Sequence, residues 1–187
     1  MKKLLLVVLA FFSFVVNATR LNLETGNLDA RLQSELTKAI DNQFEGKQKV
    51  FVSVFNNKVL LYGDVTKIEF KAEATNLVTK DKVFWSGHFP TRLIDQITVN
   101  QVVPPSETNL DNQIHDSIKA RLPESLLKLI KITVFNGNVF LLGIVTKSEG
   151  DLIASYASQT SNVKGVYKIF DIVSDSDAQR SDRASKQ

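Results

Sequence analysis

Apolar and polar residues alternate through two short stretches near residues 50–65, and the same pattern returns eighty positions later. Residues 52–67 read VSVFNNKVLLYGDVTK and residues 132–147 read ITVFNGNVFLLGIVTK, with nine of these 16 positions identical. Similar composition does not produce this degree of identity, so the chain is an internal duplication. Alternation at every second position predicts β-strands, and each copy is therefore predicted to contain two of them.

Turn and capping signals follow each predicted strand. Asn56-Asn57 and Asn136-Gly137 tolerate positive φ, which a two-residue type I′ hairpin requires at both central positions. After the second strand, Thr66 to Glu69 and Thr146 to Glu149 match the capping box that starts a helix. Each copy is therefore predicted to run strand, tight turn, strand and capped helix. The capped helices are predicted over residues 68–79 and 148–159.

A further helix is predicted before each hairpin, and a third strand after each capped helix. Apolar residues at every fourth position from Leu32 to Ile40 form one helix face behind Asp29, which can cap the helix. Asp111 precedes the same spacing in the second copy, where Pro123 ends the helix. The third strands are predicted at residues 93–99 and 167–173, each reached by a right-handed crossover.

The predicted fold class is α+β, with two αββαβ domains, each a three-stranded mixed sheet packed against two helices. The predicted boundaries are residues 28–100 for the first domain, 101–109 for a linker and 110–173 for the second domain. A unit of about 65–70 residues buries barely enough surface to be stable, so the two copies are expected to stabilise each other. Residues 174–187 contain no large apolar residue and are predicted to be a disordered tail.

Residues 1–18 have the pattern of a secretory signal peptide. Lys2 and Lys3 precede 13 mostly apolar residues, and the stretch ends on the small residue Ala18. That run is too short for a membrane span, which needs about 20 residues. We expect cleavage after Ala18 and a periplasmic location. Cleavage lowers the formal net charge from +3 to +1 because two lysines are lost, so a general attraction to nucleic acid is not expected.

Residue types that carry catalysis or bind metals are scarce. The chain has no cysteine, which excludes disulfides, thiol catalysis, cysteine metal sites and lipoprotein acylation. Its two histidines, His88 and His115, fall in different copies and are interpreted as surface residues. Gly63 and Gly143 are isolated and form no phosphate-binding loop; they predict a close backbone approach or a bulge. We therefore expect no enzyme activity, no cofactor and no metal.

Two segments suit contact with a lipid surface. Phe84 and Trp85 lie in Lys82–Phe89, an extension absent from the second copy, beside basic residues. That combination fits the headgroup region of an anionic bilayer, although these rings fit a core or the interface between the copies equally well. In the second copy, basic residues stand beside several leucines, which favours phosphate binding with shallow insertion. A solvated helix face next to core leucines explains this second stretch more simply. The basic residues concerned are Lys119, Arg121, Lys128 and Lys131.

The hairpin, the Leu-x-Gly-x-Val-Thr-x-x-Glu stretch and the Gly165-Val166 step together resemble the BON domain. The resemblance covers residues 28–173 and is stronger in the second copy. The tandem arrangement is similar to the dual-BON-domain outer-membrane proteins of Gram-negative bacteria. This resemblance implies a non-enzymatic periplasmic protein that maintains envelope integrity through weak binding to anionic phospholipid. It also implies a peripheral location on the inner leaflet of the outer membrane and a role in osmotic or membrane stress.

Two points qualify what this resemblance implies. Members of the dual-domain group are typically acylated on an N-terminal cysteine, which this chain lacks, so membrane contact is expected to come from the folded surface. The alternative function is a protein-interaction scaffold, in which exposed strand edges or the aromatic extension dock an envelope protein or a second copy of the chain.

Overall fold

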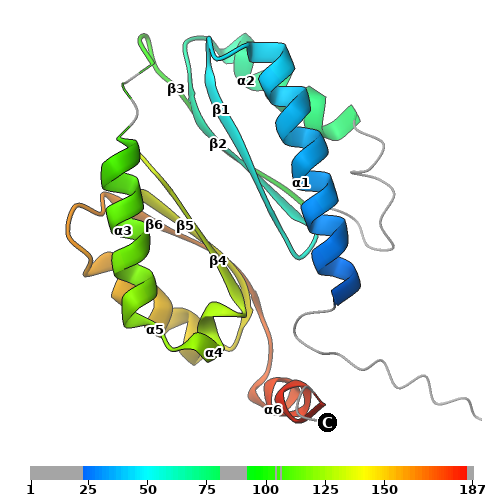
Figure 1. The fold of residues 1–187 in the computed structure, drawn as a ribbon, viewed down its shortest axis with the longest axis vertical. Helices are drawn as coiled ribbons and strands as arrows, with labels where there is room; N and C mark the ends of the chain where they lie inside the picture. Colours follow the sequence, from blue (N-terminus) through cyan, green and yellow to red (C-terminus); the bar gives the residue numbers. More distant parts are fainter. Residues whose placement is uncertain (1–22, 81–91, 104, 106, 185–187) are drawn as a thin grey trace, which may run out of the picture.

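The computed structural model describes residues 23–80, 92–103, 105 and 107–184, and it contains both αββαβ units (Figure 1). The first unit comprises α1 (Leu23–Phe44), β1 (Lys49–Phe55), β2 (Lys58–Val65), α2 (Ile68–Lys80) and β3 (Arg92–Val99). The second comprises α3 (Thr108–Arg121), α4 (Glu124–Leu127), β4 (Ile130–Phe135), β5 (Asn138–Val145), α5 (Lys147–Ser158) and β6 (Gly165–Ile172), and α6 (Asp175–Ala184) follows.

The two sheets have the same topology. Their strand orders are β1-β2-β3 and β4-β5-β6. The hairpin strands are antiparallel, and the third strand lies parallel to the second because it returns through a helix. Asn56, Asn57, Asn136 and Gly137 all have positive φ, between 47° and 78°. The predicted α+β class, mixed sheets and left-handed turn residues are thus confirmed.

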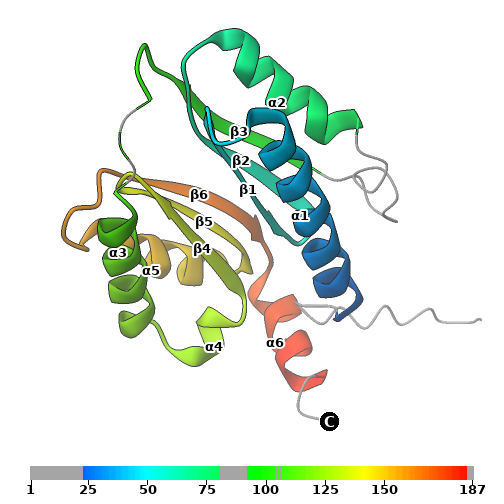
Figure 2. The same ribbon diagram turned by 45° about the horizontal axis from the view of Figure 1, so that its top comes forward.

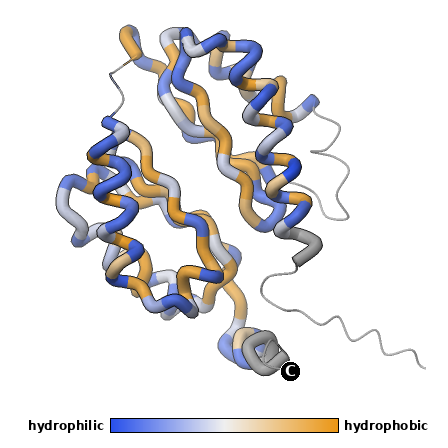
Figure 3. The backbone as a smooth tube through the Cα atoms, viewed as in Figure 1, coloured by the Kyte–Doolittle hydropathy of each residue, from blue (hydrophilic) through white to orange (hydrophobic). Residues whose placement is uncertain are grey.

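Each sheet is covered on both faces. Val52 and Val54 of β1 pack with Leu32 and Leu36 of α1 in the core of the first unit. The opposite face of each sheet packs on the other sheet, where Leu60 of β2 joins residues of the second unit. The result is a four-layer sandwich with helices outside and sheets inside (Figure 2). Figure 3 shows the same division, with hydrophobic strands between helices of mixed hydropathy.

Asp29 and Asp111 hold the hairpins and do not cap the helices that carry them. α1 begins six residues before Asp29, and Asp111 lies in the first turn of α3 after the N-cap Glu107. The Asp29 carboxylate accepts hydrogen bonds from the backbone amides of Asn56 (2.5 Å) and Asn57 (3.1 Å). Asp111 accepts from Asn136 and Gly137, both at 2.8 Å. The prediction of helix caps was wrong because the turn amides are better placed to reach these carboxylates.

Three other predictions differ from the structure. The capping box is present at Thr146 and Glu149, but the Thr66 amide donates to the Gln48 side chain (2.9 Å). α1 starts at Leu23, well before the helix face that was predicted from Leu32 to Ile40. The tail predicted to be disordered contains α6, which begins behind Ser174: its hydroxyl accepts from the Asp177 amide at 3.2 Å. Composition misses this helix because it has no apolar stripe.

Some expectations fall outside the described residues. They include the signal peptide at residues 1–18 and the aromatic extension with Phe84 and Trp85. Within the part of the chain that the structure describes, none of the helices is long and apolar enough to cross a membrane.

Gly63 provides a test of the fold. Its φ is +132°, and a Cβ built on it would lie 1.8 Å from the Lys49 carbonyl oxygen, a close backbone approach of the kind predicted from sequence. We expect Gly63→Ala to destabilise the protein by more than about 3 kcal/mol, because neither backbone can move without breaking the β1–β2 pairing. Urea denaturation measures the change.

Gly26 is the matched control. It lies in α1, and an added Cβ would meet nothing within 4 Å. Gly26→Ala is expected to stabilise the protein by about 0.5–1 kcal/mol through helix propensity. Equal effects of the two substitutions would contradict the described geometry of β1 and β2.

Candidate functional site

Arg121 is a predicted basic residue that makes both a stacking contact and hydrogen bonds. It lies at the end of α3, where its guanidinium carbon is 4.8 Å from the centre of the Tyr156 ring of α5. The guanidinium donates to the Tyr156 carbonyl oxygen (3.3 Å) and to Gln159 Oε1 (3.1 Å). Stacking on an aromatic face and hydrogen bonding through two nitrogens fix the orientation of the group, which remains solvent-exposed.

Arg121 lines a groove between α3 and the loop that follows α5, with a volume of about 350 Å³. Hydroxyl and amide groups make up most of its wall, and Leu110 and Ile114 form an apolar part. Side chains that donate hydrogen bonds beside an exposed guanidinium match what a phosphate oxygen requires. The remaining lining residues are Gln113, Ser117, Gln159, Thr160, Ser161 and Asn162.

The other three predicted basic residues do not share this groove. Lys119 is exposed on α3, but residues two apart on a helix do not face each other, so it lies on the opposite flank from Arg121. Lys128 is exposed and pairs with Glu124 at 2.8 Å. Lys131, on β4, lies between the two units. The structure therefore does not bring the four cations together at one surface.

The leucines beside these cations belong to the core. Leu126 is buried, and Leu127 and Leu129 pack against the hydrophobic cluster of the second unit. They are not displayed on the surface for insertion into a bilayer. This agrees with the simpler interpretation of the stretch as a solvated face next to core residues.

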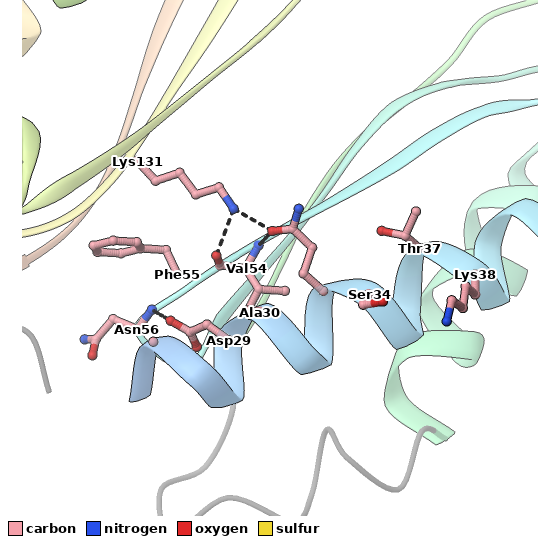
Figure 4. A pocket seen from close by; sticks show the side chains of 11 residues that line it. Asp29, Ala30, Ser34, Thr37, Lys38, Val54, Phe55, Asn56 and Lys131 are labelled. Atoms are coloured by element: carbon pink, nitrogen blue, oxygen red, sulfur yellow. Dashed lines mark hydrogen bonds between the residues drawn. The ribbon is translucent and has the colours of Figure 1, made fainter. Parts of the chain in front are cut away.

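Lys131 connects the units through neutral oxygen atoms. Its ammonium group donates to Gln33 Oε1 on α1 (2.5 Å) and to the Val54 carbonyl on β1 (3.1 Å). Burial lowers the pKa of Lys131 below its usual range, although the nearby Asp29 charge opposes the shift. These residues border a second groove, about 620 Å³ in volume, along α1 (Figure 4).

A set of polar contacts joins the two sheets, and sequence reasoning missed it. Ser53 and Thr133 occupy equivalent positions in the two copies, and Thr133 donates to Ser53 at 3.2 Å. Asn136 donates to Asp64 (3.0 Å), which also accepts from Asn100 (2.7 Å). At the other end, the Asp171 carboxylate accepts from Asn56 (3.0 Å) and pairs with Lys58. Each hairpin tip is thus held by a carboxylate of the opposite sheet.

The arrangement offers no metal cluster among the residues described. No group of three or more His, Cys, Asp or Glu side chains lies close enough there to hold an ion. His115 sits next to Asp116, with its Nδ1 3.0 Å from the carboxylate, on the surface of α3. The chemistry available at the described surface is hydrogen bonding and ion pairing, centred on Arg121 and Lys131.

Comparison with known proteins supports the resemblance of the second unit to the BON domain. Residues 110–173 match the family model of the BON domain. The chain is similar to the outer membrane lipoprotein DolP of Haemophilus influenzae, with 28% identity over 76% of this chain and 73% of that protein. It is also similar to a 21 kDa hemolysin of Actinobacillus pleuropneumoniae, with 26% identity over 78% of this chain and 71% of the other. The C-terminal domain of the type III secretion protein CdsD of Chlamydia trachomatis aligns with 11% identity and a TM-score of 0.30, over 78% and 67% of the two chains, a likeness too weak to carry an argument.

Titration of three carboxyl groups tests the electrostatics of these sites. Burial raises the pKa of Asp29 and of Asp64 above 3.8, against the hydrogen bonds that each accepts. Hydrogen bonds from Lys147 and Lys168 lower the pKa of the exposed Asp151 below 3.8. NMR titration of the side-chain carboxyl carbons should therefore place the midpoints of Asp29 and Asp64 above that of Asp151.

The directions of these pKa shifts determine how the stability of the protein changes with pH. A carboxyl with a raised pKa contributes stability that is fully present below the ordinary value and lost as pH rises through the raised value. Asp151 behaves in the opposite sense, with stability lost as pH falls through its lowered value. Midpoints in the reverse order would show that Asp64 and Asp29 are solvated, which would contradict the burial to which their raised pKa values are attributed.

Proposed function

We propose that this protein, whose residues 110–173 match the family model of the BON domain, is a non-enzymatic component of the bacterial envelope that binds anionic phospholipid weakly, from the periplasmic side. Its similarity to an outer membrane lipoprotein supports the envelope assignment. We further propose that binding helps maintain the outer membrane under osmotic or membrane stress. In this proposal the protein is exported by cleavage after Ala18.

The observation that carries the proposal is the oriented guanidinium of Arg121 in the groove between α3 and the loop that follows α5. Its contacts with Tyr156 and Gln159 hold the group in place, so a phosphate does not have to order it on binding. The side-chain amides of Gln113 and Asn162 line the same groove, whereas the Ser117 hydroxyl already donates to the Gln113 carbonyl oxygen (2.7 Å). A lipid phosphate bound there would be held by ion pairing and by side-chain hydrogen bonds together.

Lys119 adds electrostatic attraction without coordinating the phosphate directly, whereas Glu124 offsets the charge of Lys128. Lys119 is exposed in the same unit as Arg121, and a basic side chain near an anionic surface contributes about 1 kcal/mol. The nearly neutral charge of the mature chain keeps the overall attraction small. Binding is therefore expected to be reversible and to weaken with added salt.

The alternative, a scaffold that recruits a protein strand, is less well supported at β1. Both outward-facing backbone groups of Val54 on this edge strand are already occupied, by Gln33 and Lys131. The backbone of an added strand would therefore find no hydrogen-bond partner at Val54. Phe84 and Trp85 remain candidates for membrane contact, and Trp85→Ala in the vesicle assay below tests them.

Co-sedimentation with phospholipid vesicles tests the proposal. The mature protein should bind vesicles that contain phosphatidylglycerol at low salt and release them at high salt. Lys119→Glu/Arg121→Glu should weaken binding by about tenfold or more, since both charges are reversed near the surface. Vesicles of phosphatidylcholine alone should bind little protein.

The control is Lys47→Glu/Lys67→Glu, which changes the net charge by the same amount on exposed residues of the first unit. It should leave most of the binding intact. An equal loss of vesicle binding in both double variants would show that only the net charge matters and would contradict a role for the Arg121 groove. Absence of binding at low salt in the unaltered protein would contradict lipid binding altogether.

A further inference from the structure

The groove along α1 is separate from the Arg121 groove and has a different character. Its helix wall is a stripe over about three turns of α1, with residues spaced three and four apart. Val54 and Phe55 of β1 and Asn56 of the turn that follows form its floor, and Lys131 reaches in from β4 (Figure 4). Its volume of about 620 Å³ lies within the range of small-molecule sites, and most of its surface is apolar.

The two ends of the lining differ in character. Gly26, Ala30 and Phe55 give one end its apolar surface, and a Cβ added at Gly26 would meet nothing within 4 Å, so space is open there. Asp29 and Asn56 also line this end, where the Asp29 carboxylate accepts a hydrogen bond from the Asn56 amide. Ser34 and Thr37 present hydroxyl groups toward the other end, where Lys38 also lies. Figure 4 shows Lys131 above this helix, between the two ends. A ligand that matches this division has an aliphatic body and one polar end.

Lys131 indicates which charge the polar end of the ligand carries. An ammonium group has three donors, and the two hydrogen bonds of Lys131 go to the neutral oxygens of Gln33 and Val54. Asp29, the acidic group nearby, already accepts from the amides of Asn56 and Asn57 and does not hydrogen-bond to Lys131. Asp29 acts on Lys131 through its charge only, and both hydrogen bonds of this half-buried cation go to neutral oxygens, so an anion at the edge of the cavity complements its third donor.

A peptide is a poor occupant of this groove. The Val54 N–H donates to Gln33 Oε1 at 3.1 Å and its carbonyl accepts from Lys131, so the edge of β1 offers no template for strand addition at that residue. A peptide lying over Val54, Ala30 and Phe55 would bury its own amides without partners, which costs free energy. An aliphatic chain carries no such groups.

We propose that this groove binds an aliphatic carboxylate, with the carboxylate on Lys131 near Ser34 and Thr37, and the chain along Ala30 and Gly26 against Phe55. The site binds one monomeric ligand per chain and needs no bilayer. It shares no residue with the Arg121 groove, so it does not depend on the proposed function.

Isothermal titration of the full mature protein with decanoate, below the concentration at which it forms micelles, tests the site. We expect one decanoate per chain, and weaker binding of butyrate because it lacks the chain. Ser34→Trp fills the groove from an exposed position and should abolish binding. Asn42→Trp places the same residue on an exposed position of α1 outside the groove and should leave binding unchanged.

The charge is tested separately. Lys131→Gln should weaken decanoate binding by about tenfold and leave the binding of decanol unchanged, because only the carboxylate pairs with the ammonium. Decanoate binding that survives Ser34→Trp would overturn the proposal, as would an equal loss of decanol and decanoate in Lys131→Gln. If an acidic peptide bound more tightly than decanoate, and Ser34→Trp abolished this binding, the assignment of an aliphatic ligand to the groove would be wrong.

Discussion

The packing of the two sheets on each other is the constraint on which the rest of the structure depends. Leu60 of the first unit forms a buried cluster with Phe135, Phe140 and Leu142 of the second, so this core belongs to neither unit alone. Burial of a side chain of this size contributes about 1.5–3 kcal/mol, whereas an intramolecular hydrogen bond contributes a net of about 0.5–1.5 kcal/mol. The apolar cluster therefore supplies most of the stabilisation, and the hydrogen bonds of Asp64 and Asp171 set the relative orientation. Because both inner faces are buried, helices and loop ends supply most of the surface that remains for binding.

Duplication followed by divergence explains why the two units present different surfaces. Each hairpin asparagine reaches a carboxylate of the opposite sheet, but Asp64 lies on β2 and Asp171 on β6. In the first unit the aspartate is on the second strand, where Asp64 pairs with Thr98, and in the second unit it is on the third strand, where Asp171 pairs with Ile144. The aspartate thus occupies neighbouring strands in the two copies, whereas the residue that donates to it is the hairpin asparagine in both. The Arg121 groove lies on the outer face of the second unit, whereas the groove along α1 needs Lys131 from the second unit to complete it.

Local sequence signals predicted most of the fold because hairpins, helix starts and strand periodicity depend on neighbouring residues. The alternation in Val59 and Leu61 predicted that one face of the sheet is buried. Leu60 and Leu142, on the opposite faces of β2 and β5, are fully buried as well. A strand that is apolar on both faces is the sequence signal of a sheet that is covered on both sides. The partners of Lys131 could not be predicted, since Gln33 is 98 residues away and the pairing depends on how the units dock. For the same reason, Lys119 and Arg121 looked like one patch in sequence although the helix separates them. Arg121 was identified from its charge, but its orientation by Tyr156 required the structure.

Native-state amide hydrogen exchange on a Phe140→Ala variant is the most direct test of the claim that the two sheets form one core. Phe140 is buried and packs against Tyr62 of the first unit, with ring centres 5.9 Å apart. Loss of a buried phenylalanine costs about 3–5 kcal/mol. If the sheets open as one unit, the protection of the slowest amides in β2 should fall by the same free energy as that of the slowest amides in β5. A loss confined to β5, with β2 unchanged, would show that the two units are independent and would contradict the shared core.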